Sequence, residues 1–150
     1  MGIVNPYFPS ESAEKLAQAN DIKVFVETGT CLGGTSKYAA AHFEEVHTIE
    51  LSEMLFSRAK DSLLALGNIT PYLGDSRTVL PTIIAKSKGN ILFWLDAHYS
   101  AGGTAGKDDP CPLITELDIL LRRTQNDIFI IDDAREMIGG GLPHSCRYTA

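Results

Sequence analysis

A carboxylate and a glycine turn directly follow the first strand-like segment of the sequence. Glu27 ends the strand-like residues 23–27, and the chain then turns through Gly29, Thr30 and Gly33 before a helical stretch. Glycines in such a turn let the backbone approach a small ligand closely. Glu27 would repel the pyrophosphate of a dinucleotide and attract a ligand with positive charge. The turn therefore favours S-adenosylmethionine (SAM), which carries an ammonium and a sulfonium group.

Further acidic residues follow the next two strand-like segments. Glu50 closes the second, 23 residues after Glu27, close to the roughly 20-residue spacing at which an acid meets ribose hydroxyls. Asp75 and Ser76 follow the third, where a carboxylate and helix N-terminal amides could hold the amino edge of adenine. Each acid alone is more often a helix N-cap or a solvated loop residue. In this order and spacing, they predict a nucleoside site.

A second set of carboxylates follows the fourth and fifth strand-like segments. Asp96 ends the fourth, and Asp132 and Asp133 end the fifth. Adjacent parallel strands would bring these three together, where they repel one another unless a cation neutralises them, and oxygen ligands select Mg²⁺. The alternative is that Asp132 and Asp133 cap a turn. His98 has three candidate roles: a general base, a ligand of a softer metal, or an oriented loop residue.

A divalent ion beside SAM gives these residues a common chemistry. Coordination of a substrate hydroxyl lowers the pKa of that hydroxyl and holds the oxygen in line with the methyl group. Asp96 would then serve both the cofactor and the metal, and we expect Asp96 and His98 to be the catalytic residues, with His98 taking the proton.

The elements that position these residues alternate between strand and helix periodicity, which predicts an α/β fold with a mainly parallel sheet. Ser52 is the predicted N-cap of the helix expected over residues 52–66. The loop 100–111 is either a substrate loop or an insertion. The expected strands are residues 23–27, 45–50, 69–73, 91–96 and 127–132, and the expected helices are residues 10–18, 34–42, 52–66, 76–86 and 112–123.

Composition limits the classes of partner. The 150 residues predict one domain, 1–150, with an N-terminal lead-in over 1–20 and an irregular tail over 139–150. A formal charge of -6 without long basic runs disfavours nucleic acid. The apolar runs are too short to span a bilayer, and no signal peptide is evident, so we expect a cytoplasmic protein with no membrane partner. Three widely spaced cysteines predict free thiols.

Over residues 23 to about 138 the sequence resembles class I SAM-dependent methyltransferases. The glycine turn resembles their first motif, Glu50 their ribose-binding acid and Asp75-Ser76 their adenine-side motif. Asp96 and Asp132-Asp133 match the magnesium ligands of metal-dependent O-methyltransferases of the catechol and macrocin type. The resemblance implies a Rossmann-like three-layer αβα sandwich with strand order 3-2-1-4-5, and a hydroxylated small-molecule acceptor such as a sugar or glycoside.

The sequence departs from this family at its C-terminus. The family sheet ends in an antiparallel hairpin, and no two strands are evident after Asp133, so we expect the hairpin to be missing. The fifth strand would then be an apolar edge that a homodimer could cover. A catalytically incompetent SAM-binding or interaction module is a second interpretation. A nucleotide-dependent oxidoreductase is a third, disfavoured by Glu27 and by the absence of a full GxGxxG motif.

Overall fold

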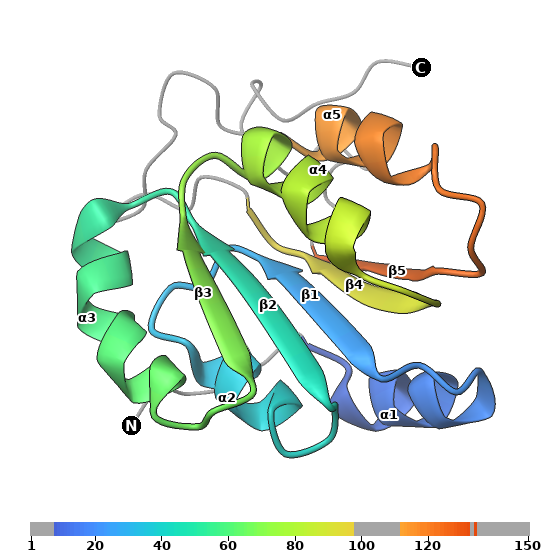
Figure 1. Cartoon of the computed structure of the whole chain (residues 1–150), viewed down its shortest axis with the longest axis horizontal. Helices are drawn as coiled ribbons and strands as arrows, with labels where there is room; N and C mark the ends of the chain where they lie inside the picture. The colour runs from blue at the N-terminus through green and yellow to red at the C-terminus, as the bar shows by residue number, and fades with distance from the viewer. Residues whose placement is uncertain (1–7, 98–111, 133, 135–150) are drawn as a thin grey trace.

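A five-stranded parallel sheet organises the chain (Figure 1). The computed structural model describes residues 8–97, 112–132 and 134. The strand order is β3-β2-β1-β4-β5, so the predicted α/β fold and strand order are confirmed. The predictions about a missing hairpin and an irregular tail fall on residues outside the described part of the chain. The strands are β1 (Val24–Thr28), β2 (Glu45–Glu50), β3 (Ile69–Leu73), β4 (Ile91–Leu95) and β5 (Ile128–Ile131).

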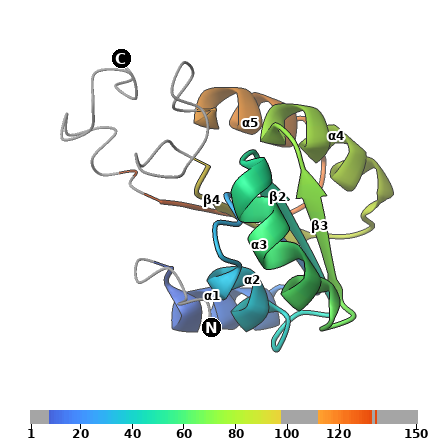
Figure 2. The ribbon, with the colours of Figure 1, turned by 90° about the vertical axis from the view of Figure 1, so that its left-hand side faces the viewer.

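Helices cover both faces of the sheet, as the two views in Figures 1 and 2 show. One face packs against α1 (Ser10–Ala19), α2 (Gly34–Ala39) and α3 (Glu53–Leu64), and the other against α4 (Ser76–Lys86) and α5 (Leu113–Leu120). Two buried apolar clusters fill the two interfaces. This is the three-layer αβα arrangement that the sequence resemblance implied.

The central strand β1 sends alternate side chains into the two layers. Phe25 belongs to the cluster under α1, α2 and α3, and Val26 to the cluster under α4 and α5. By the same alternation Glu27 faces the first layer and Thr28 the second. Two adjacent polar residues at the end of one strand therefore serve different sides of the sheet.

The predicted elements are confirmed, and the structure differs from the prediction mainly at their ends. Ser52 is the N-cap of α3, where its side chain accepts a hydrogen bond from the amide of Leu55 at 3.4 Å. The fifth strand begins at Ile128 rather than at Asp127, because the Asp127 side chain accepts a hydrogen bond from the Ile91 amide at 2.8 Å. No helix within the described residues is long and apolar enough to cross a membrane.

A buried ion pair joins the end of α5 to the start of β5. Arg123 Nε lies 2.6 Å from Asp127 Oδ2, with side-chain exposures of 10% and 2%. We expect Arg123→Met to lower the free energy of unfolding by about 3–5 kcal/mol, because the variant leaves the Asp127 carboxylate buried without its cation. Denaturant unfolding monitored by circular dichroism measures the loss.

The exposed pair Lys15–Glu11 is a matched control, since it also spans four residues at 2.6 Å. Lys15→Met should leave the unfolding midpoint unchanged, because solvent screens that pair. Equal effects of the two substitutions would show that burial of the Arg123–Asp127 pair contributes nothing.

Candidate functional site

The acidic strand-end residues gather at one edge of the sheet because all the described strands are parallel. Glu27, Glu50 and Asp75 lie at or just beyond the carboxyl ends of β1, β2 and β3. Asp96 and Asp132 follow β4 and β5, whose last paired residues are Leu95 and Ile131. The sheet thus places these five carboxylates along one edge, where ligands of open α/β sheets bind.

The glycine turn is held between the ends of β2 and β4. The amides of Gly29 and Thr30 donate to the Ile49 carbonyl at 2.9 and 3.1 Å. Gly29 has φ +91°, and a Cβ placed on it would lie 2.5 Å from the backbone oxygen of Asp96. Gly33 has φ +74° and lies close to the Leu63 side chain. The turn therefore requires glycine both for its backbone conformation and for its approach to β4.

Glu27 lies beneath this turn and is only 2% exposed. The hydroxyls of Ser36 and Thr48 both donate to its Oε2 atom, the second at 2.8 Å. Burial raises the pKa of Glu27 to about 7, and the charge of Glu50 adds to the increase, whereas the two hydroxyl groups oppose it. The structure places Glu27 in a buried polar network that joins β1, β2 and α2, with a carboxyl group that titrates near neutral pH.

Glu50 ties the turn to the start of α3. Its Oε2 accepts a hydrogen bond from the Cys31 amide and its Oε1 from the Ser52 amide, both at 2.8 Å. Each carboxylate oxygen can accept a further hydrogen bond. The predicted ribose-binding acid therefore sits against the glycine turn and keeps acceptor capacity for a hydroxyl group.

Asp75 is the N-cap of α4, which is the alternative role that strand-end acids often have. Its side chain accepts from the Arg77 amide at 2.9 Å, and its Oδ2 lies 2.6 Å from Arg77 Nη2. Hydrogen bonding to Arg77 lowers the pKa of Asp75 despite the opposing effect of burial. Ser76, the next residue, is buried. The predicted adenine-side motif, Asp75-Ser76, therefore forms the N-terminus of α4, and the lowered pKa of Asp75 favours its ionised form.

The carboxylates at the ends of β4 and β5 are backbone neighbours. The Asp132 amide donates to the Leu95 carbonyl at 3.1 Å, and the Asp96 amide donates to the Thr28 carbonyl at 3.1 Å. Asp133 and His98 lie outside the described residues. Within residues 8–97, 112–132 and 134, no group of three His, Cys, Asp or Glu side chains could hold a metal ion. The structure therefore brings together two of the three predicted metal ligands.

One buried acidic residue of the site, Glu116, was not predicted from the sequence. Glu116 of α5 is 1% exposed and lies near Thr28 and Ser76, whose side chains hydrogen-bond to it. The sequence does contain a signal, because Glu116 occupies the apolar stripe formed by Leu113 and Leu120 at helical spacing. A carboxylate on the buried face of a helix therefore marks this position.

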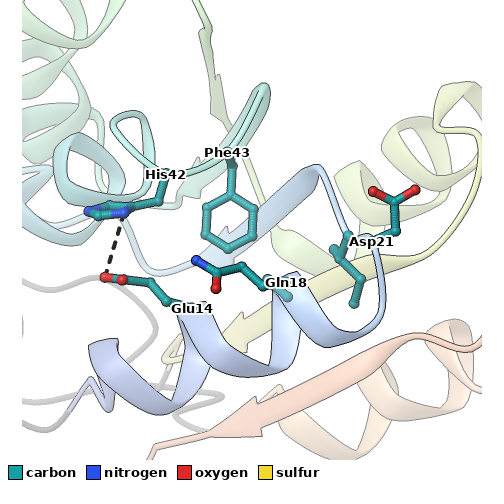
Figure 3. Close-up of a pocket in the computed structure, with 7 residues that line it drawn as sticks. Glu14, Gln18, Asp21, His42 and Phe43 are labelled. Carbon is teal, nitrogen blue, oxygen red and sulfur yellow. Dashed lines mark ion pairs between the residues drawn. The ribbon is translucent and has the colours of Figure 1, made fainter.

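A cavity lies at the opposite edge of the sheet. It has a volume of about 300 Å³ and is lined by residues of α1 and of the segment before β2, as Figure 3 shows. Two of its lining residues, Glu14 and His42, form an ion pair at 3.6 Å. Because Ile22, just before β1, also lines it, the cavity lies at the amino ends of the strands, away from the glycine turn.

Solved structures share this fold. No protein-family profile matches the sequence, and no curated protein matches it. The O-methyltransferase TomG from Streptomyces achromogenes, solved with SAM, superposes with a TM-score of 0.63 at 18% identity, over 88% of this chain and 56% of that one. A candidate caffeoyl-CoA O-methyltransferase from Staphylococcus aureus gives 0.61 at 19%, over 95% and 66%.

The 23S rRNA methyltransferase ErmE gives a TM-score of 0.57 at 13% identity, over 93% of this chain and 52% of that one. The chain spans between 52% and 66% of the lengths of these three proteins. At such identities the likeness concerns the fold alone, and the chain has the Rossmann-like fold that these methyltransferases share.

Proposed function

We propose that this chain is a SAM-dependent methyltransferase that acts on a hydroxyl group of a small molecule such as a sugar or glycoside. The observation that carries the proposal is the glycine turn, which Ile49 and Glu50 anchor at the carboxyl edge of the sheet. TomG, which shares the fold, is an O-methyltransferase solved with SAM. The fold likeness and the turn support the same ligand on independent grounds.

The acidic residues at the carboxyl edge of the sheet support a nucleoside that carries positive charge. Glu27 and Glu50 both border the turn, and the Glu27 carboxyl group titrates near neutral pH, so a cation at the turn would stabilise its ionised form. A pyrophosphate would instead meet two carboxylates. Glu50 keeps acceptor capacity that suits the ribose hydroxyls.

The proposal includes a divalent ion, most simply Mg²⁺, held by Asp96, Asp132 and Asp133. Asp96 and Asp132 fit such a site, because they are oxygen ligands at the ends of paired neighbouring strands. When bound, the ion would lower the pKa of the acceptor hydroxyl. His98 would accept the proton of that hydroxyl.

Calorimetric titration with S-adenosylhomocysteine (SAH) tests the donor site. We expect the wild-type chain to bind one equivalent and Glu50→Gln to bind about 10- to 100-fold more weakly, because hydrogen bonds to a charged acceptor contribute about 1.5–3 kcal/mol. Glu53→Gln, an exposed position three residues further on, is the matched control and should bind as the wild type does. Folded wild-type protein that binds no SAH would refute the proposal.

Turnover tests the metal. With a panel of hydroxylated acceptors, we expect methyl transfer that chelation abolishes and added Mg²⁺ restores, and Asp132→Asn should lose this response while it retains affinity for SAH. Turnover that is insensitive to chelation would remove the ion from the mechanism.

A second candidate is a SAM-binding module without turnover, for which the glycine turn anchored by Ile49 and Glu50 would suffice. Binding of SAH without transfer to any acceptor would support it.

The homodimer stays a prediction. In the described sheet β5 pairs with β4 alone, and light scattering at several concentrations tests whether a second copy covers its other edge.

A further inference from the structure

Glu116 is a buried acid that the proposed chemistry does not use. It lies on α5, 1% exposed, between the apolar residues Leu113 and Leu120 that pack against the sheet. Its Oε1 atom is buried and has no hydrogen-bond partner within the described part of the chain. An unpaired buried polar atom destabilises a fold, so its presence here calls for a role outside simple packing.

The partners of Glu116 come from the nucleoside site. Thr28 immediately precedes the glycine turn, and Ser76 begins α4 next to the Asp75 cap. The side chains of both residues hydrogen-bond to Glu116. A single carboxyl group on α5 therefore joins the end of β1 to the start of α4.

The Thr28 hydroxyl extends this connection to β4. Its oxygen accepts a hydrogen bond from the Asp96 amide at 3.3 Å, so its proton is available to donate to Glu116. Glu116 is thus linked through two hydroxyl groups to the start of the glycine turn, to the start of α4 and to the Asp96 amide.

The neutral form of the acid suits this position. Burial raises the pKa of Glu116, and the charge of Asp75 adds to the increase, whereas the hydrogen bonds from Ser76 and Thr28 and the charge of Arg77 oppose it. A neutral carboxyl group both donates and accepts hydrogen bonds, as a glutamine amide does. Glutamine is therefore the conservative replacement.

We propose that Glu116 is a positioning residue of the nucleoside site, which holds Thr28 and Ser76 in the arrangement that the bound nucleoside requires. This inference rests on the proposed SAM site. It differs from a structural role in one respect: replacing Glu116 by an apolar residue should weaken ligand binding without weakening the fold.

Two substitutions at this position, with one control, test the inference. Glu116→Met should melt close to the wild-type temperature, because removal of the unpaired buried oxygen offsets the loss of the hydrogen bonds to Thr28 and Ser76, while its dissociation constant for SAH rises about tenfold. Glu116→Gln should bind SAH within about twofold of the wild type, because the amide preserves the hydrogen bonds. Leu120→Met, an equally buried change on the same helix, should alter neither quantity.

Amide hydrogen exchange separates this inference from the SAM assignment. The Gly29 amide bonds to Ile49 and the Arg77 amide to Asp75, so both are protected. We expect both amides to exchange faster in Glu116→Met but not in Leu120→Met. This difference is expected even if the wild type binds no SAH. Absence of SAH binding would refute the proposed ligand and leave the positioning role of Glu116 standing. Unchanged exchange, unchanged SAH affinity, or a parallel loss of stability and affinity in Glu116→Met would overturn the positioning role.

Discussion

Gly29→Ala is expected to weaken SAH binding about 100-fold and to lower the free energy of unfolding by about 2–4 kcal/mol. The new methyl group would lie 2.5 Å from the Asp96 carbonyl oxygen, closer than a carbon atom can approach, and the residue would keep φ +91°. The turn must therefore move away from β4, which displaces the backbone that we assign to the ligand. Calorimetry and denaturant unfolding measure the two effects.

Gly67→Ala is the matched control for this experiment. Gly67 has φ +83°, close to that of Gly29, but no atom lies within 4 Å of a Cβ placed on it. It should therefore show only the conformational cost of a positive φ, about 1–2 kcal/mol, and normal SAH affinity. If Gly29→Ala bound SAH as Gly67→Ala does, the close approach of the turn to β4 would have no part in binding.

Glu27→Gln is expected to stabilise the chain in a pH-dependent way. The pKa of Glu27 is raised from 4.5 to about 7, so the native state holds this proton more tightly than the unfolded state does. As pH rises from about 4.5 to 7 the unfolded chain ionises first, and the wild type loses about 3 kcal/mol that the glutamine variant keeps. The amide oxygen can still accept the hydrogen bonds from Ser36 and Thr48.

Urea unfolding at pH 5 and pH 8 measures this difference, with the low-pH pair as the internal control. We expect a small stability difference between variant and wild type at pH 5 and a stabilised variant at pH 8. A difference that is the same at both pH values would mean that the Glu27 carboxyl group is not titrating between them. A cation at the turn should offset the cost, so added SAM should stabilise the wild type more than Glu27→Gln at pH 8.

Local sequence patterns predict the helices and strands of this molecule well. The strand β4, the helix α3 and its cap at Ser52 depend on neighbours in sequence, and the sequence predicts all three. The glycine turn was predictable for the same reason, since a positive φ leaves a signature in residue type.

The protonation states of Glu27 and Glu116 were not predictable, because each depends on groups brought in by distant elements. The Oε2 atom of Glu27 accepts hydrogen bonds from Ser36 on α2 and Thr48 on β2, and burial raises its pKa. Asp75 is the exception, because its partner Arg77 is only two residues further along the chain, and the cap was among the predicted alternatives. Glu116 acquires Thr28 and Ser76 only when α5 packs against the sheet, and no spacing in the sequence encodes that contact.

The shared fold does not determine which acceptor we should propose. The structures that share this fold include an O-methyltransferase and an rRNA methyltransferase, so architecture alone does not choose between hydroxyl and RNA acceptors. The formal charge of -6 weighs against a polyanionic acceptor. The small hydroxylated acceptor that we propose is compatible with this charge.

The central claim is that the glycine turn at the carboxyl edge of the sheet binds the nucleoside of SAM. Titration of the ¹⁵N-labelled chain with SAH, followed by heteronuclear NMR, tests it most directly. We predict the largest saturable shifts at the amides of Gly29, Cys31 and Gly33, with the residues around the Glu14–His42 cavity unaffected. No shifts at the turn, or saturable shifts confined to that cavity, would contradict the claim.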